Sequence, residues 1–562
     1  MQYIIKTFAR ILILSVPCFA NAQSTYLPQT HKHQQLLERL EILLQKNPDL
    51  NVATVKPLSR KIAVRIGEYA DSVQDASGNT LSMVDQHNLQ SLYMNNSEWI
   101  GGDKTDFASR KNLWNTFYKT KAHLLEVDEN DFFLAVNPVI QQQQSIENDN
   151  DQRIFLNSKG LTMRGMIAGK IGFSAYLTDN QERAPLFVQD RINRTQAVPG
   201  AGYYKAFKTT ATDYFDARGS IDFTVAKYVD VQFGYDKNFI GNGYRSLYLS
   251  DFGNSYLFLK LNTRIWKINY QNLYMELAPQ FVKSGADNLL DKKYATMHHL
   301  SINATKWLNI GLFEAVIFGR KNRFEFGYLN PVIFLRSAER NNGSADNGIA
   351  GLDFKANIAK KLQLYGTWML DEFFLKEVRA GRGWWGNKFG VQLGGKYIDV
   401  LKIKNLDIQG ELNWVRPFSY SHYDSVSNYT HYNQPLAHPL GANFMEAIGI
   451  IRYQPHPKWT TSARLIVWKQ GLDTAGFNFG GNIFKLNGTR SVEYGYTIPS
   501  GVSATGINAQ LLVSYEPKEN VFLDVSLLIR RWKATELPSV NRNTSLITAG
   551  LRMNMFRREY EY

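Results

Sequence analysis

The chain has 562 residues, a formal net charge of +14 at pH 7 and 13% aromatic residues. Its one cysteine, Cys18, lies in a segment that we expect to be removed, which excludes disulfides, thiolate catalysis and cysteine-bound metals in the mature chain. No later stretch contains 18 consecutive apolar residues, so the sequence predicts no transmembrane helix; a membrane barrel would escape this test because only every second strand residue faces lipid.

The N-terminal segment, residues 1–22, has the pattern of a secretory signal peptide. Lys6 and Arg10 supply a short basic region, ten apolar residues follow, and Ala20 and Ala22 are the small residues of a cleavage site. We therefore expect cleavage after Ala22. Nucleic acid is a poor partner for an exported chain, so its positive charge favours anionic lipid or glycan.

Residues 31 to about 95 have a hydrophobic period of 3.6, which predicts amphipathic helices. The expected helices lie at 36–44, from Pro57 to near Gly78, and at 82–95. They are short, so they must pack on each other or on another surface. Residues 96–130 are interpreted as an aromatic-rich linker, and the region 23–130 as periplasmic.

At Asp131 the hydrophobic period changes to 2 and remains so to the end of the chain. About eighteen strands are expected over 131–562. The clearest of them lies near 405–416, where Leu406, Ile408 and Leu412 alternate with polar residues.

The connections between these strands alternate in length. One set is short and basic, and carries aromatic residues: Tyr228, Trp266, Trp307 and Trp459. The other set is long: roughly 179–213, 237–253, 278–293, 319–346, 373–386, 417–442 and 471–503. Periplasmic turns and surface loops of outer-membrane barrels alternate in this way, and aromatic residues mark the membrane interface.

The last strand shows which face is expected to meet lipid. Its apolar positions share one parity: Ile547, Ala549, Leu551, Met553 and Met555. Its other positions are expected to face the lumen: Thr548, Gly550, Arg552 and Asn554. Phe556 would then be the terminal aromatic residue that barrel-insertion machinery recognises. The last strand is also expected to close the barrel by pairing with the strand near Asp131.

The sequence contains no convincing catalytic or metal-binding pattern. Gly241-Asn242-Gly243 lacks the third glycine of a dinucleotide site. His298 and His299 are adjacent on a strand and face opposite sides, so they cannot share one metal. His31 and His33 are interpreted as part of a solvated tail. We expect no enzyme activity and no cofactor; an enzyme is the alternative that stays open, because barrel enzymes assemble Ser, His and Asp sites from distant strands.

The long loops carry side chains suited to sugars. Aromatic rings stack on sugar faces, and arginine pairs with carboxylate or phosphate groups. The candidate glycan-binding residues are Tyr244, Arg245, Arg379, Arg382, Trp384, Trp385, Tyr420, His422, Tyr423, Tyr429 and Tyr432. The alternative for each aromatic residue is that it packs the loops into a lid over the barrel mouth.

Four strings carry a family resemblance. They are DFFLAVNP at 131–138, GLTMRGMI at 160–167, residues 237–251, and FGYLNPV at 326–332. Together they resemble the Wzi family of capsule-assembly outer-membrane proteins, especially its Bacteroidota branch, which includes the gliding-motility protein RemB. The resemblance spans the mature chain. It implies a surface lectin that holds exported polysaccharide without an enzymatic step.

The sequence thus predicts a mainly β protein, a transmembrane antiparallel β-barrel of about eighteen strands preceded by a small periplasmic helical bundle. The expected location is the outer membrane, and the expected partners are membrane lipid, an acidic surface polysaccharide and barrel-insertion machinery. A porin-like channel and a role in gliding motility are the alternatives. The glycan and the oligomeric state stay open.

Overall fold

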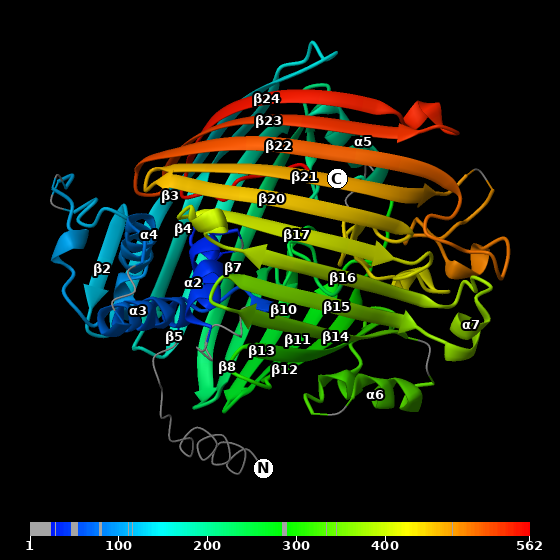
Figure 1. Ribbon diagram of the computed structural model, residues 1–562, viewed down its shortest axis with the longest axis horizontal. Coiled ribbons are helices and arrows are strands. Elements are labelled where there is room, and N and C mark those ends of the chain that lie inside the picture. Colours follow the sequence, from blue (N-terminus) through cyan, green and yellow to red (C-terminus); the bar gives the residue numbers. More distant parts are fainter. Residues whose placement is uncertain are drawn as a thin grey trace, which may run out of the picture.

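The computed structural model describes residues 24–28, 30–45, 54–77, 81–110, 112–114, 116–283, 289–332, 334–343, 346–474 and 476–561. The expected signal peptide therefore lies outside the described residues. The described chain forms a closed antiparallel barrel with the N-terminal helices at one of its ends (Figure 1). The predicted change from helix to strand near Asp131 is confirmed, because the first barrel strand begins at Phe132.

Eighteen strands close the barrel, as the alternating pattern predicts. They are β3 (Phe132–Glu147), β4 (Ile154–Ile167), β5 (Ile171–Arg183), β7 (Ala211–Ala226), β8 (Val229–Asp236), β10 (Tyr256–Ile265), β11 (Ile268–Leu277), β12 (Lys293–Asn303), β13 (Leu308–Phe318), β14 (Asn347–Ile358), β15 (Leu362–Glu372), β16 (Lys388–Tyr397), β17 (Leu406–Val415), β20 (Phe444–His456), β21 (Trp459–Leu472), β22 (Val502–Lys518), β23 (Val521–Ala534) and β24 (Arg542–Met553).

Shorter elements fill the ends and the interior. The short strands are β1 (Val55–Lys56), β2 (Leu125–Glu129), β6 (Lys205–Phe207), β9 (Phe239–Ile240), β18 (Thr430–His431) and β19 (Gln434–Pro435). The helices are α2 (Gln34–Leu44), α3 (Arg60–Ser77), α4 (Met83–Met94), α5 (Leu186–Thr195), α6 (Leu335–Asn341) and α7 (Leu375–Ala380). The three predicted N-terminal helices correspond to α2, α3 and α4.

The last strand closes the barrel on the first. β24 pairs with β3 from Met553↔Ile140 to Leu546↔Glu147, as expected. The other half of the β3 edge is covered by β2, which pairs Leu125 with Val136 and Glu129 with Phe132. The β3 edge is therefore covered along almost its whole length.

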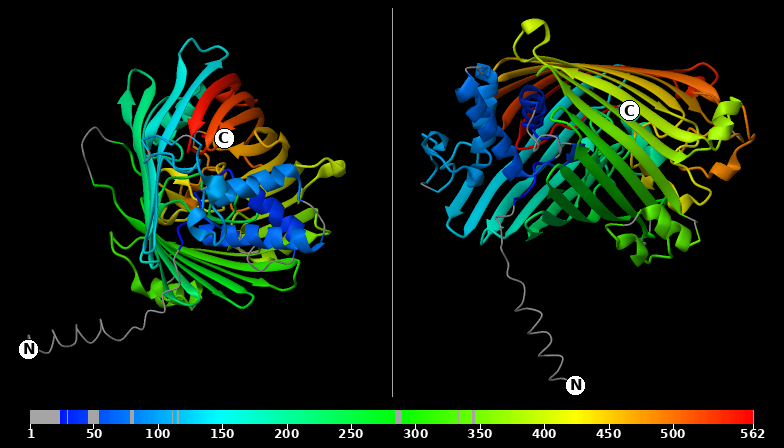
Figure 2. Two further views of the ribbon diagram at one scale, coloured as in Figure 1. Left: turned by 90° about the vertical axis from the view of Figure 1, so that its left-hand side faces the viewer. Right: turned by 60° about the horizontal axis from the view of Figure 1, so that its bottom comes forward.

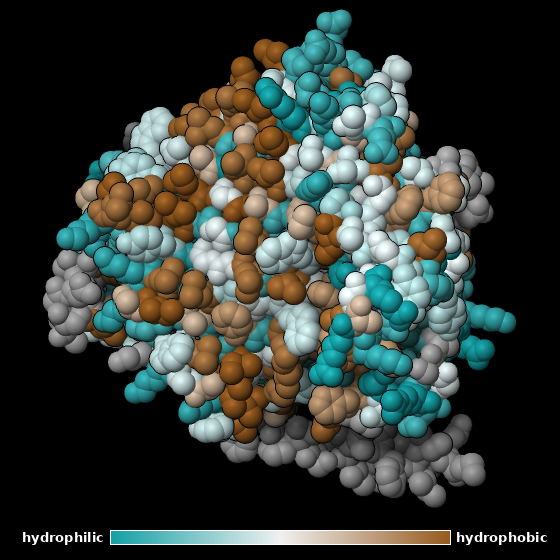
Figure 3. Space-filling model, turned by 45° about the vertical axis from the view of Figure 1, so that its right-hand side comes forward, coloured by the Kyte–Doolittle hydropathy of each residue, from teal (hydrophilic) through white to brown (hydrophobic). Residues whose placement is uncertain are grey.

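Strand side chains alternate between an apolar outer face and a polar lumen. On β17, Ile408 and Leu412 are 38% and 43% exposed, whereas Gln409 and Glu411 are 2% exposed. Successive strand residues point to opposite faces, so the exposed apolar set lies outside and the buried polar set lies inside. Apolar side chains spread over the side of the molecule in Figure 3.

The two ends of the barrel differ as the connections predict. Residues 227–228, 266–267, 457–458 and 519–520 are short turns at one end, and the long loops gather at the other, toward α7 in Figure 1. We call these the short-turn end and the long-loop end. β3 begins and β24 finishes at the short-turn end, which is the arrangement that an even number of strands requires.

β3 and β4 are longer than predicted. β3 continues to Glu147 and β4 begins at Ile154, and the neighbouring strands pair with this added hairpin as far as Glu147 on the β24 side and Phe155 on the β5 side. The added part of β3 contains Gln141–Gln144 with no apolar alternation, and Gln142 and Gln144 on its outer face are exposed. The hydrophobic period therefore gave no signal there, although the backbone pairing continues.

The helices α2, α3 and α4 lie across the short-turn mouth of the barrel (Figure 2). Leu36, Leu40, Ile66 and Leu92 pack together as their own small core. Arg39 on α2 contacts Asp85 of α4 at 3.0 Å, and it joins the helices to the barrel through Asp399 at 3.1 Å and through Asp407. The helices are thus fixed to the barrel by buried charge pairs.

The two adjacent histidines of β12 face opposite sides, as predicted. His299 points into the lumen and contacts Asp353 at 2.9 Å. His298 points outward, contacts Glu314 at 3.0 Å and is only 2% exposed. It is buried because the loop that contains α6 folds back over the outside of the barrel, where the backbone N–H of Leu335 donates to Glu314.

The chain does not stop at the end of β24. Thr548 and Arg552 face the lumen and Ile547 and Leu551 face outward, as expected. Met555, however, is 8% exposed and lines the lumen, so its predicted outward position is wrong. The strand pattern ends at Met553, after which the backbone turns into the barrel.

Candidate functional site

A cluster of exposed and half-buried arginines and aromatic residues occupies the rim at the long-loop end. Trp384 and Trp385 lie with ring centroids 5.8 Å apart, and the Arg490 guanidinium lies 3.9 Å from the centroid of the Trp385 ring. Beside them the Arg382 guanidinium lies 4.3 Å from the centroid of the Tyr494 ring. We call these five residues the rim cluster. Its aromatic faces and cations lie side by side at the surface.

Backbone hydrogen bonds between two long loops hold the rim cluster together. The backbone N–H of Trp385 donates to Glu493, and those of Gly495 and Tyr496 donate to Arg382 and Gly383. The Trp385 indole N–H donates to the Glu493 carboxylate at 2.7 Å. Burial raises the pKa of the Glu493 carboxyl, but hydrogen bonds from Arg490 and Trp385 outweigh this effect and hold the pKa below its usual value. The cluster is therefore ordered before any ligand arrives.

Arg379 lies near this cluster on α7, a helix with no buried residues. Its side chain is exposed, as is that of Arg382, whose guanidinium pairs with Glu377 at 2.9 Å. The predicted residues Arg379, Arg382, Trp384 and Trp385 are thus brought to one part of the surface.

The aromatic residues of the loop over 417–442 are divided between the surface and the interior. Tyr420 and Tyr429 are each 1% exposed, and their hydroxyl groups donate to the backbone oxygens of Leu247 and Tyr248. They hold the loop inside the barrel mouth, as the lid alternative expects. Tyr423, by contrast, is 57% exposed.

His422 and Tyr432 complete the predicted set in this loop. His422 is 6% exposed, and burial followed by the charge of Lys388 lowers its pKa. Tyr432 packs edge-on against Phe281 with centroids 4.8 Å apart. Their rings therefore contribute to loop packing.

Tyr244 and Arg245 lie in the lumen, away from the rim. Arg245 is 7% exposed and contacts Glu561 of the C-terminal segment at 2.8 Å. The Tyr244 hydroxyl receives a hydrogen bond from Arg464 at 2.6 Å and bonds to the same Glu561. The eleven predicted residues thus occupy three places: the rim, the packed loop and the lumen.

The C-terminal segment, residues 554–561, is the part of the interior that sequence reasoning missed. Phe556 packs on Tyr176 with centroids 5.8 Å apart, and Tyr560 packs edge-on against Phe187 on α5. Phe556 therefore lies inside the lumen. The prediction that it is the terminal aromatic residue of the last strand is wrong, because β24 ends at Met553. The available signal was the charged tail itself, which carries two arginines followed by two glutamates, because charges in a terminal segment require partners.

Segments of the chain enter the lumen from both ends of the barrel, and these segments contact each other inside it. The segment before α3 enters from the short-turn end, and β1 pairs with β9 of the long loop that enters from the opposite end. The backbone N–H of Gly241 donates to Thr54 at 2.8 Å, and the Thr54 hydroxyl donates to Asn242 at 2.7 Å. This contact joins chain segments from the two ends of the barrel inside its lumen.

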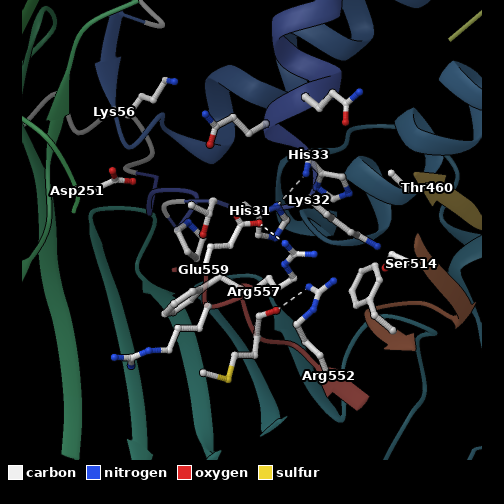
Figure 4. A pocket seen from close by; sticks show the side chains of 18 of the residues that line it. His31, Lys32, His33, Lys56, Asp251, Thr460, Ser514, Arg552, Arg557 and Glu559 are labelled. Carbon is white, nitrogen blue, oxygen red and sulfur yellow. Dashed lines mark hydrogen bonds and ion pairs between the residues drawn. The ribbon is translucent and has the colours of Figure 1, made fainter. Parts of the chain in front are cut away.

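A cavity of about 650 Å³ remains beside this contact, and we call it the luminal cavity. It is lined by the N-terminal segment, the barrel wall and the C-terminal segment (Figure 4). His31 and His33 face it, and His33 is 2% exposed. The prediction that these histidines form a solvated tail is therefore wrong; they are covered because the chain before α2 enters the barrel.

Among the described residues, no group of His, Cys, Asp or Glu is arranged to hold a metal ion. No helix of the described chain is long and apolar enough to cross a membrane.

The comparisons with known proteins concern the fold. No family model matches the chain, and no curated protein matches it. The solved structure of Wzi from Escherichia coli, described as a carbohydrate-binding outer-membrane β-barrel involved in group 1 capsule assembly, is similar with a TM-score of 0.56 and 14% identity, over 95% of this chain and 100% of that one.

Two porin structures are also similar, to a smaller extent. OprD from Pseudomonas aeruginosa has a TM-score of 0.41 and 12% identity, over 74% of this chain and 94% of its own. OccAB4 from Acinetobacter baumannii has a TM-score of 0.42 and 10% identity, over 76% and 98%.

Proposed function

We propose that this protein is an outer-membrane barrel that binds exported polysaccharide at the cell surface through its rim cluster and catalyses no reaction. The exposed apolar outer face and polar lumen support membrane insertion, since a barrel leaves no unpaired backbone edge in lipid. With the helices at the short-turn end, the long loops would face the outside of the cell. Capsular polysaccharide is the ligand suggested by the resemblance to the Wzi family.

The rim cluster is the observation that carries this function. Trp384, Trp385 and Tyr494 present rings that can stack on sugars, and Arg382 and Arg490 stand beside those rings. Arginine at such positions favours carboxylate or phosphate substituents. An acidic polysaccharide would therefore satisfy both kinds of side chain at once.

Binding of the cell's own polysaccharide to the purified barrel tests the proposal. The double variant Trp384→Ala/Trp385→Ala should bind at least about tenfold more weakly, since each stacked ring contributes on the order of 1 kcal/mol. Trp266→Ala is the matched control, because Trp266 is 77% exposed at the short-turn end. Unchanged binding by the double variant would remove the rim cluster from the site.

A solute channel is the second candidate, and the luminal cavity is the observation that favours it. The cavity shows that the chain segments inside the barrel leave part of the lumen empty. The β1–β9 contact argues for closure. Conductance in planar bilayers separates the two functions: large steady openings by the intact protein would favour the channel, and silence would favour the closed barrel.

A further inference from the structure

The luminal cavity contains more positive than negative side chains. Fourteen Lys or Arg residues line it, against six Asp or Glu residues. Carboxylates behind the wall compensate some of these cations, as Asp524 does for Arg552 at 2.8 Å. Among the described residues, Arg60, Lys237 and Arg452 have no carboxylate within ion-pair distance. A buried cation without a directly bound counterion is costly, even where carboxylates act on it from further away, as Asp216 and Asp251 do on Lys237, so this cavity favours an anion.

Lys237 is the most informative of the three. It follows directly on β8, is 8% exposed and lines the cavity. Its Nζ lies over the turn at Gly200, where an added Cβ would be 3.2 Å away. No described side chain or backbone oxygen accepts a hydrogen bond from this Nζ, although an ammonium group has three donors. Burial and then the neighbouring Arg218 lower the pKa of Lys237 to about 7.

Other donors in the cavity are also incompletely used. The Arg557 guanidinium binds Glu559 through Nη2 at 2.6 Å, while its buried Nη1 has no partner among the described residues. The buried Nε of Arg60 likewise has none in the described part of the chain. Arg557 and Glu559 line the same cavity as His31 and Lys32 (Figure 4). Buried donors normally have acceptors, so these groups indicate an acceptor that the chain itself does not supply.

The C-terminal segment shows which acceptor suits the cavity. Its Glu561 carboxylate contacts Arg245 at 2.8 Å and Arg464 at 2.9 Å. Glu559, two residues earlier, pairs with Arg464 and Arg557. The tail thus places two carboxylates against Arg245 of the long loop before β10, Arg464 of β21 and its own Arg557. It acts as an internal anionic ligand that occupies only part of the basic surface.

We propose that the luminal cavity is a second binding site, for an anion that carries a carboxylate or a phosphate group, with Lys237 as its principal contact. The anion would lie beside the C-terminal segment, in the space that Glu559 and Glu561 leave open. A volume of about 650 Å³ is within the range of small-ligand pockets. This site does not depend on the rim cluster. Its ligand is either an acidic sugar or free inorganic phosphate.

Calorimetric titration of the purified full-length barrel tests the site. Inorganic phosphate is one probe, a tetrasaccharide containing glucuronic acid is another, and maltotetraose is the neutral control. Lys237→Met should weaken binding of the anionic probe about tenfold, because a charge-assisted hydrogen bond is lost. The matched control Lys361→Met removes an exposed lysine from a short turn and should change nothing.

A second variant acts in the opposite direction. Glu561→Gln removes a carboxylate that competes for Arg245 and Arg464, so it should strengthen anion binding several-fold. If Lys237→Met does not fold, Arg452→Gln removes another cation without an ion-pair partner and should also weaken binding.

The probes distinguish the sources of the ligand. Binding of phosphate alone identifies free phosphate, and binding of the tetrasaccharide but not maltotetraose identifies an acidic sugar. Failure of both anionic probes, equal binding of maltotetraose, or full affinity in Lys237→Met would overturn the proposal. The Trp384→Ala/Trp385→Ala variant should retain this binding, so failure of the rim cluster would be recognised separately.

Discussion

The rim cluster and the luminal cavity use the same residue types in opposite ways. At the rim, Arg382 and Arg490 lie over aromatic rings at the surface. In the lumen, Arg245 and Arg464 are buried and bind carboxylates of the chain itself. Arg382 is exposed and Arg490 is half-buried, and cations at such positions contribute little to folding and can reach a ligand. Buried ones are strongly coupled to their partners, so the exposure of an arginine indicates its role better than its neighbours in sequence do.

The largest effect is expected where a buried arginine is removed. Arg39 is 4% exposed and pairs with Asp85, Asp399 and Asp407. Arg39→Met would leave these buried carboxylates uncompensated, at a cost of about 3–5 kcal/mol. Helices α2–α4 should therefore detach from the barrel and become sensitive to protease.

The rim supplies the control for this prediction. Arg382→Met removes an arginine of similar chemistry whose pair with Glu377 is at the surface, and protease sensitivity should not change. Equal sensitivity of the two variants would contradict the distinction between buried and exposed arginines.

A charge on the outer face comes next. Leu551 lies on the outward side of β24, so Leu551→Arg should cost about 2–4 kcal/mol if the position is near the middle of the bilayer. The urea midpoint of the heat-modifiable gel shift measures this change. Leu551→Ala separates the effect of charge from that of size. An unaltered midpoint for the arginine variant would argue against a lipid-facing β24.

Acid should destabilise the packing of the N-terminal segment against the short-turn end of the barrel. Burial is the largest cause that lowers the pKa of His31 and His33 well below the usual value, and the charge of Lys32 also contributes. The unfolded histidines take up protons near pH 6.5 and the folded ones do not, so stability is lost as pH falls below about 6.5. Each histidine contributes at most about 1.4 kcal/mol per pH unit.

Protease protection of α2–α4 between pH 7 and pH 5 measures this loss. The variant His31→Gln/His33→Gln keeps polar side chains that do not titrate, and its protection should depend less on pH. An identical pH profile in the variant would show that other groups cause the effect.

The smallest effect concerns salt. Charge reversal of Arg379 and Arg382 removes two exposed cations from the rim, so the remaining polysaccharide binding should depend less on ionic strength if the ligand is anionic. Titration at low and high salt measures the slope. A slope equal to that of the unaltered protein would assign the charge dependence to other residues.

The barrel could be predicted from sequence because its signal is local. Alternation along each strand, as in Ile408 to Leu412, and the contrast between short turns and long loops do not depend on distant contacts. The hairpin of β3 and β4 was underestimated because Gln141–Gln144 carry no apolar period.

The interior could not be predicted in the same way. Tyr420 and Tyr423 are close in sequence and equally suited to a sugar, yet one is buried against Leu247 and the other is exposed. Only long-range packing decides between them. The same holds for Phe556 and His33, which local patterns placed at the outer end of a strand and in a solvated tail.

Retention of polysaccharide by living cells tests the central claim most directly. In a strain that lacks this protein, surface polysaccharide should be shed into the medium, and the unaltered gene should restore it to the cells. The Trp384→Ala/Trp385→Ala variant, present at the same level in the outer membrane, should leave the polysaccharide in the medium. Full retention with this variant, or in the strain without the protein, would contradict the account.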